Sequence, residues 1–372
     1  MMIERSLHPT AAAALEVIYQ HRLLATSQLH QIMAPSHRVR WIQRLLAVLE
    51  GRGLADAVAA HPRRTGRAER LWYVTERGAE VVEAVPNRTE TRRRLLTAQV
   101  AGGQLQAHTL AVNDVGIAFL RTARERGHDF GALSWRHEVA HQLNPGRRYP
   151  DLLVADAVLR YWTTSLDGET ALHYRFLELD RANLLMDDLV AKLARYARLY
   201  RLWAEQRRTA AGGSEAPAWP ALYRAFPNVL VILANPGRAN LQRRLETVRA
   251  LCSAEPELRR CPPLTISFAL FEDLTAWGPF APVFRRPGDD RLLNWLGQPA
   301  GETRRSAGAT GRQASASATA TTATRPGPAR STSTTRASPT TTGRRDGSAP
   351  SGRCAPVTTS EPPAVTPTRS RR

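Results

Sequence analysis

The order of apolar segments between residues 104 and 271 constrains the fold more than any other feature of the 372-residue sequence. A helical segment, QLQAHTLAVNDVGIAFLRTARERG, begins at Gln104 and is apolar on nearly all sides. Three strand-like segments, a long helix from Asn183 to about Trp203, an apolar strand, another helix and a final strand follow it. This α-β-β-β-α-β-α-β order predicts a mixed sheet with helices on its faces, in the α+β and α/β classes.

A smaller arrangement precedes this one, over residues 8–86. The segments PTAAAALEVIYQHR and TSQLHQIM predict two helices, and a third begins at Ser36. In that third helix Val39, Ile42, Leu46 and Leu49 form one apolar stripe at helical spacing. The strand-like segments LADAVAA and RLWYVT then flank an arginine-rich loop, and VTERGAEVVEA predicts a closing helix. Three helices followed by a basic hairpin predict a winged helix-turn-helix that binds DNA.

The candidate DNA contacts lie on the polar face of the third helix and in the loop between the two strands. Side chains on that helix would contact base edges or phosphates in the major groove, and the loop arginines would bind backbone phosphate. An ordinary amphipathic helix with a solvated basic face is the alternative, and such a domain can also serve as a homodimer interface. The candidate residues are His37, Arg40, Trp41, Arg44, Arg63, Arg64 and Arg67.

Net charge supports a polyanionic partner, most simply DNA, because the chain carries a formal charge of +19. Residues 299–372 hold twelve arginines against three acidic residues in a Ser/Thr/Ala/Pro-rich tail with almost no large apolar side chain. Such a segment cannot bury enough surface to order itself, so we expect a disordered tail. Its role is either extra nonspecific DNA affinity or none. Residues 87–103 read as a linker that ends in a glycine pair.

Several other classes of protein are disfavoured. No segment approaches the roughly 18 apolar residues of a membrane span, and the first residues carry charges where a signal peptide is apolar, so we expect a cytoplasmic protein without membrane contact. The cysteines Cys252, Cys261 and Cys354 are odd in number and lack zinc-ligand spacing, which argues against disulfides and structural zinc. We also expect no small-molecule cofactor.

One lysine, Lys192, stands among 52 basic residues that are otherwise all arginine. It follows the strand HYRFLELD, in which Glu178 and Asp180 are two residues apart and therefore share a face. Asp151 opens the preceding strand and can approach Glu178. Carboxylates gathered in this way need a neutralising cation, and Mg²⁺ or Mn²⁺ is the usual choice for phosphate chemistry.

These residues resemble a known motif. Pro150–Asp151, then a strand with Glu178 and Asp180, then Lys192, within an α-β-β-β-α-β order, resembles the restriction-endonuclease-like PD-(D/E)xK superfamily. The resemblance implies that Asp151 and Glu178 hold a divalent metal and that Lys192 assists the attacking water or the transition state. The usual lysine position, two residues after the glutamate, is Asp180 here, and Asp180 is then a further catalytic and metal-ligand candidate.

The larger pattern resembles the replication-relaxation family of plasmids and integrative elements. The residues that carry this likeness are the opening helices, HTLAVND at 108–114, the Pro-Asp at 150, FLELDR at 176, KLARY at 192 and WGPFAPVFRRP near the end. The resemblance implies a role in plasmid replication or DNA relaxation, with a nuclease-like domain over residues 104–298.

Two functions remain open at this point. The first is a metal-dependent DNA endonuclease or nickase, positioned on DNA by its winged helix. The second is a non-catalytic DNA-binding replication or transcription regulator with a degenerate nuclease-like domain. In that case Glu178 and Asp180 would simply form ion pairs with neighbouring basic residues at the end of the sheet.

Asp156, in LLVADAVLRY, competes with Asp151 for the role of first carboxylate. A lone histidine on a buried helix, such as His108, is more typical of a hydrogen-bonded core residue than of a ligand. Tyr196 and Tyr200 have a spacing that also suits packing.

Overall fold

A computed structural model describes residues 7–60, 69–84, 95–97, 101, 105–145, 147–210, 223–235 and 237–299. The described residues belong to one compact unit. The tail expected to be disordered and most of the expected linker lie outside the described residues. Among the helices of the described ranges, none combines the length and apolarity that crossing a bilayer requires.

The N-terminal elements follow the predicted order with one addition. The short strand β1 was not predicted, and it pairs with β3, so that the small sheet has the order β1-β3-β2. The elements are α1 (Pro9–His21), β1 (Leu24–Ala25), α2 (Thr26–Met33), α3 (Val39–Gly51), β2 (Ala55–Ala59), β3 (Arg70–Val74) and α4 (Glu76–Glu83).

The third helix, α3, differs from the prediction at its first turn. It begins at Val39 rather than Ser36, because the preceding residues form a turn in which the His37 N–H donates to the Ala34 carbonyl at 3.0 Å. Ile42, Leu46 and Leu49 are buried as expected, whereas Val39 is 42% exposed. The apolar stripe therefore begins one turn later than the sequence pattern indicated.

The second part is a seven-stranded mixed sheet with the order β10-β9-β8-β7-β6-β5-β4. Strand β5 pairs antiparallel with β4 and with β6, and strand β7 pairs parallel with β6 and with β8. The elements are α6 (Leu105–Arg126), β4 (Trp135–Gln142), β5 (Leu152–Thr164), β6 (Thr170–Asp180), α7 (Met186–Ala210), β7 (Asn228–Leu233), α8 (Arg238–Ala254), α9 (Pro256–Arg259), β8 (Ile266–Leu270), α10 (Phe271–Trp277), β9 (Phe284–Arg286) and β10 (Asp289–Leu293).

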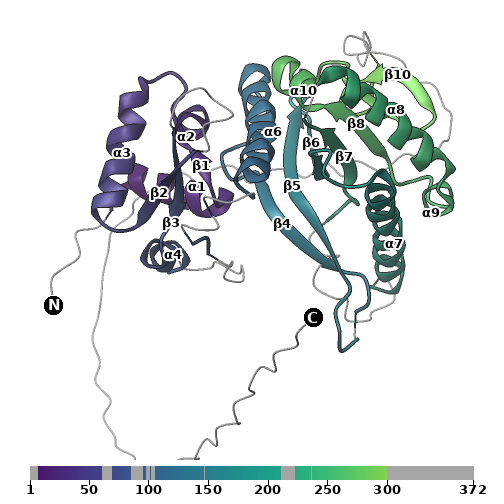
Figure 1. The fold of residues 1–372 in the computed structure, drawn as a ribbon, viewed down its shortest axis with the longest axis horizontal. Helices are drawn as coiled ribbons and strands as arrows, with labels where there is room; N and C mark the ends of the chain where they lie inside the picture. The colour runs from purple at the N-terminus through teal and green to yellow at the C-terminus, as the bar shows by residue number, and fades with distance from the viewer. Residues whose placement is uncertain are drawn as a thin grey trace, which may run out of the picture. The chain divides into compact units, whose positions relative to one another are not determined.

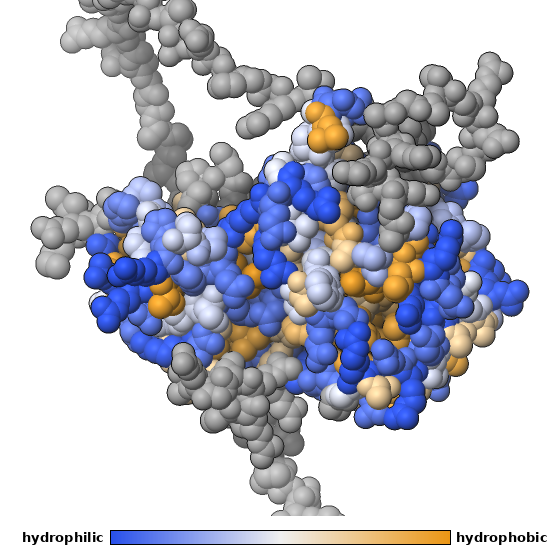
Figure 2. Space-filling view, turned by 90° about the horizontal axis from the view of Figure 1, so that it is seen from above, coloured by the Kyte–Doolittle hydropathy of each residue, from blue (hydrophilic) through white to orange (hydrophobic). Residues whose placement is uncertain are grey.

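Helices cover both faces of this sheet, as the sequence predicts (Figure 1). Residues of α6 and α10 pack with Leu177 and Ile232 in one core, and residues of α7 and α8 pack with Phe176 and Val231 in a second core. Successive residues of β6 and β7 thus face opposite cores, which is why these strands read as continuous apolar segments. The surface seen in Figure 2 is mostly hydrophilic, with scattered apolar patches.

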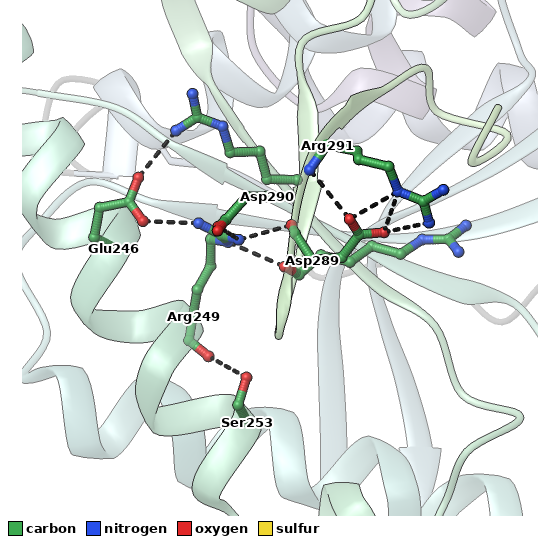
Figure 3. A network of polar contacts seen from close by, with 8 residues as sticks. Glu246, Arg249, Ser253, Asp289, Asp290 and Arg291 are labelled. Carbon is green, nitrogen blue, oxygen red and sulfur yellow. Dashed lines mark hydrogen bonds and ion pairs between the residues drawn. The ribbon is translucent and has the colours of Figure 1, made fainter. Parts of the chain in front are cut away.

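The hairpin of β9 and β10, which the sequence pattern did not reveal, is fastened to α8 by two arginines (Figure 3). Arg285 of β9 donates to Glu246 of α8 at 2.9 Å, and Arg249 of α8 makes the other contacts. Arg249 is 5% exposed, and its guanidinium donates to the Arg286 and Asp289 carbonyls at 3.0 and 2.7 Å and to Glu246 and Asp290 at 2.7 and 2.8 Å. A short hairpin rich in charged residues lacks the apolar segment that marks a strand, which is why the sequence pattern missed it.

The N-terminal elements pack directly on α6 and β4. The His21 ring stacks on Trp135 with centroids 4.0 Å apart, and the Gln20 amide donates to the Trp135 carbonyl at 2.8 Å. Asn113, fully buried on α6, donates to the Leu23 carbonyl at 2.9 Å. The apolar core of α1, α2 and α3 is continuous with that of α6.

Candidate functional site

Along the antiparallel pair of β4 and β5, the face of the sheet on which odd-numbered side chains lie changes partway along the strands. Ala157 and Leu159 pack in the core under α6, whereas Leu153 and Ala155, also at odd positions, pack in the core under α7 and α8. Alternation in a strand has a period of two residues, so the pattern reverses at Asp156. Glu138 of β4, which lies between the pairs His137–Ala157 and Val139–Ala155, has a φ of 50° and reverses the pattern of its own strand at the same level.

Strand β5 also parts from β6 at this level. The backbone pairing of β5 and β6 ends at Ala157 and Leu177. The Asp156 carboxylate accepts the Leu179 N–H at 2.8 Å, so a side chain replaces the backbone carbonyl that would otherwise satisfy this group. The reversal therefore places the Asp156 carboxylate in the gap between β5 and β6. Side chains from both faces of the sheet can reach it there.

A buried glutamate lies beside that gap. Glu178, on β6, is 3% exposed, and its Oε2 accepts a hydrogen bond from Lys192 Nζ on α7 at 2.5 Å. Its Oε1 accepts a short hydrogen bond from the Tyr196 hydroxyl, one helical turn further along α7. Lys192 Nζ also lies 3.6 Å from Asp156 Oδ1. The lone lysine therefore bridges two carboxylates on neighbouring strands.

The electrostatics of the group follow from burial and from two nearby anions. Burial and the Asp156 charge raise the pKa of Glu178 to about 8, against the opposing effect of Lys192. Burial works against ionisation of Asp156 too, but His108 and Lys192 outweigh it and lower its pKa. Desolvation would lower the pKa of Lys192, yet the two carboxylates raise it, so the ammonium stays charged.

His108 enters the site from the opposite face of the sheet. It lies on α6, and its Nε2 is 3.4 Å from Asp156 Oδ2. The sequence pattern favoured a core role for this residue, because a single helical histidine does not show which strand it will meet. Asp156 did leave a signal in the sequence, namely a carboxylate in the middle of an otherwise apolar strand.

The other two predicted carboxylates lie apart from this group. Asp151 forms a short ion pair with Arg195 and lies 3.6 Å from Arg198. Asp180 is 4% exposed and accepts a hydrogen bond from Arg244 Nε of α8 at 2.5 Å. The structure therefore brings together Glu178, Lys192 and Asp156, and engages Asp151 and Asp180 with arginines.

The chemistry of the group, which we call the Glu178 cluster (His108, Asp156, Glu178, Lys192 and Tyr196), is that of a buried, charge-balanced site. Within the described ranges, no three or more His, Cys, Asp or Glu side chains are close enough to form a complete metal site. A buried carboxylate whose pKa is strongly shifted, such as Glu178, is typical of functional sites. The two carboxylates can accept protons or bind a cation, and Lys192 can bind an anion.

The candidate DNA-binding face of α3 carries exposed basic side chains. Arg40 and Arg44 are exposed, one turn apart, and within the described ranges neither forms an ion pair. Trp41 is half-buried, and its ring lies 5.5 Å from that of the exposed His37. The loop arginines Arg63, Arg64 and Arg67 lie outside the described residues.

A groove of about 620 Å³ runs along another side of α3, between this helix, α2 and β3. Its walls include Glu50 and Glu69, of which Glu50 pairs with Arg70 and Glu69 accepts the Ser27 N–H at 2.7 Å. This acidic lining is unsuited to phosphate, so the face of Arg40 and Arg44 is the better candidate for DNA.

Comparison with known proteins gives one match. The family model described as Replication-relaxation matches residues 15–213, which include the elements from within α1 to the end of α7. No curated protein and no solved structure matches the chain.

Proposed function

Because the chain belongs to the replication-relaxation family, we propose that it binds DNA during the replication or relaxation of a mobile element and cuts a DNA strand at the Glu178 cluster. The observation that carries the proposal is Glu178 itself. It is a buried carboxylate with a raised pKa, held by Lys192 and Tyr196 and facing Asp156. Building such a group costs free energy, which favours a functional role.

DNA binding is supported by the N-terminal elements. The order α1-β1-α2-α3-β2-β3, with β2 and β3 as an antiparallel pair, is that of a winged helix-turn-helix. In such domains the helix at the position of α3 enters the major groove. Arg40 and Arg44 then bind base edges or phosphates without first breaking an ion pair.

Strand cleavage is supported by the order of the larger sheet. Helix α6, the antiparallel strands β4, β5 and β6, helix α7 and the parallel strand β7 have the α-β-β-β-α-β order of restriction-endonuclease-like proteins. In this assignment Asp156 replaces Asp151 as the first carboxylate, Glu178 is the second, and Lys192 is supplied by α7.

The donor set fits a hard divalent ion. Mg²⁺ is commonly bound through one or two carboxylates, with water and substrate phosphate completing its shell, so a third protein ligand is not required. Asp156 and Glu178 would hold Mg²⁺ or Mn²⁺, and the ion would supply Lewis-acid activation of the scissile phosphate. The repulsion that raises the pKa of Glu178 is the repulsion that such an ion relieves.

The remaining side chains have separate roles. Lys192, whose pKa is raised, presents a permanent positive charge to a phosphate oxygen. His108 fixes the orientation of Asp156 through their contact at 3.4 Å. Tyr196 anchors Glu178, and burial raises the pKa of its hydroxyl well above the usual value, which disfavours it as a nucleophile.

The direct test is cleavage of supercoiled plasmid by the full-length chain with Mg²⁺ or Mn²⁺. Wild type should convert the plasmid to nicked or linear forms, and Glu178→Gln should bind DNA equally well in a gel shift while leaving the plasmid supercoiled. The proposal of cleavage fails if wild type leaves the plasmid intact with both ions, or if Glu178→Gln cuts at the wild-type rate.

A non-catalytic regulator is the second candidate, and one observation favours it. Both oxygens of Glu178 already accept hydrogen bonds within the protein, from Lys192 and Tyr196. A closed structural ion pair would look the same. DNA binding without cleavage would select this candidate.

A further inference from the structure

A second basic surface lies at the turn that joins β4 and β5. Arg147, Arg148 and Tyr149, which we call the ribbon tip, are all exposed, and Tyr149 is 77% exposed. The Arg148 guanidinium lies over the Tyr149 ring, 5.6 Å from its centroid. Within the described ranges neither arginine forms an ion pair, so both charges are available to a partner.

The ribbon tip is held in place from its base. The Asn144 side chain donates to the Tyr149 carbonyl at 2.9 Å and accepts the Asp151 N–H at 2.7 Å. The Leu143 N–H donates to the Asp151 carbonyl at 2.7 Å. An exposed tip with so many fixed contacts is pre-organised, which lowers the entropy that binding a partner would otherwise cost.

Asp151, the carboxylate that the sequence favoured as a metal ligand, links the base of the turn to α7 through ion pairs. It is the only acidic residue of the turn, and it is neutralised by Arg195 and Arg198 of α7. Arg195 also donates to the Leu152 carbonyl at 3.0 Å. These ion pairs neutralise the negative charge of the turn, so the residues of the tip itself present a basic and aromatic surface.

The ribbon tip directly precedes β5, the strand that carries Asp156 of the Glu178 cluster. Asp156 is seven positions after Tyr149, so their Cα atoms are at most about 23 Å apart at roughly 3.3 Å per residue. Successive phosphates of one DNA strand are spaced about 3.4 Å apart along the helix axis. The tip therefore reaches DNA no more than about seven base pairs from a phosphate bound at the cluster.

We propose that the ribbon tip is a second DNA contact, in which Arg147 and Arg148 bind backbone phosphates beside the cleavage site and Tyr149 packs on a sugar or base. This inference rests on the proposed function, since it takes DNA as the partner. Charge complementarity favours DNA, and a two-stranded ribbon with arginines and an aromatic residue is a form that proteins use to contact nucleic acid.

The test is the salt dependence of DNA binding, measured by fluorescence anisotropy with full-length protein and a labelled duplex between 50 and 200 mM NaCl. Each phosphate contact contributes about 0.9 to the slope of log K against log salt. Arg147→Gln/Arg148→Gln should lower the slope by about 1.8 and weaken binding about 60-fold at 0.1 M salt. Arg160→Gln/Arg208→Gln removes two exposed arginines elsewhere and should leave the slope unchanged.

Tyr149 gives an independent measurement. Tyr149→Ala should weaken binding about fivefold or more, and Tyr149→Phe should stay within about twofold of wild type, because stacking uses the ring rather than the hydroxyl. A wild type that binds no DNA defeats the proposed function. If wild type binds DNA and the Arg147→Gln/Arg148→Gln variant has the same slope of log K against log salt, this inference alone is overturned. The ribbon tip would then contact a partner other than DNA.

Discussion

Replacing Glu178 with glutamine should remove a pH dependence of stability that the wild-type protein shows between pH 5 and pH 8. Glutamine keeps the size of the side chain and still accepts a hydrogen bond from Tyr196, but it does not titrate. Folding raises the pKa of Glu178 from its ordinary value of 4.5 to about 8. Between these values the folded protein holds a proton that the unfolded chain has released.

The sign and size of the effect follow from this difference. Because the folded state binds more protons in this window, the free energy of unfolding falls as the pH rises. The maximum slope is about 1.4 kcal/mol per pH unit, so the contribution of Glu178 amounts to about 3 kcal/mol between pH 5 and pH 8. Burial lowers the pKa of His141 and of His173 to about 4, which changes stability in the opposite direction, but both histidines remain in the variant and cancel in the comparison.

Urea unfolding at a series of pH values measures this difference. Wild type should lose about 3 kcal/mol relative to Glu178→Gln as the pH rises from 5 to 8. Glu80→Gln, at an exposed position on α4, is the matched control and should follow wild type. Parallel curves for wild type and Glu178→Gln would show that Glu178 titrates in its ordinary range and would refute the electrostatic account of the cluster.

Three further substitutions test separate parts of the structure. Gly116→Ala places a Cβ 2.4 Å from the Trp135 ring and should destabilise the protein by about 1–3 kcal/mol in urea unfolding, whereas Gly131→Ala meets no atom closer than 4.0 Å and should be nearly neutral. Arg249→Met removes the hydrogen bonds from Arg249 of α8 to the β9–β10 hairpin and should speed amide exchange in that hairpin before global unfolding. Lys192→Arg replaces a compact ammonium with a planar fork and should reduce plasmid nicking at least about tenfold with DNA binding retained; full activity would make the lone lysine incidental.

Much of the fold could be predicted because its elements leave strong local patterns. The helix α2 has the predicted bounds, and the apolar segments of β6, β7 and β8 lie in the centre of the sheet. Prediction failed where local pattern is weak. Strand β1 has only two residues, and the hairpin of β9 and β10 is rich in charged residues.

The candidate site was predictable in part, and the missing part has a physical cause. Glu178 and Lys192 come together because the strand β6 and the helix α7 are consecutive elements. Asp151 was favoured over Asp156 because it follows Pro150, as in the PD-(D/E)xK motif, and opens the strand that precedes Glu178. The reversal at Asp156 depends on a positive φ at Glu138 in a neighbouring strand, which no local pattern in β5 records.

The central claim, that a cleavage site is built on Asp156 rather than Asp151, is tested most directly by one paired measurement. Asp156→Asn and Asp151→Asn are compared in plasmid nicking with Mg²⁺ or Mn²⁺, at protein concentrations that saturate the DNA. Asp156→Asn should abolish nicking, and Asp151→Asn should retain it, since Asp151 contacts only Arg195 and Arg198 among the ion pairs of the described residues. Loss of nicking in Asp151→Asn with full activity in Asp156→Asn would contradict the account.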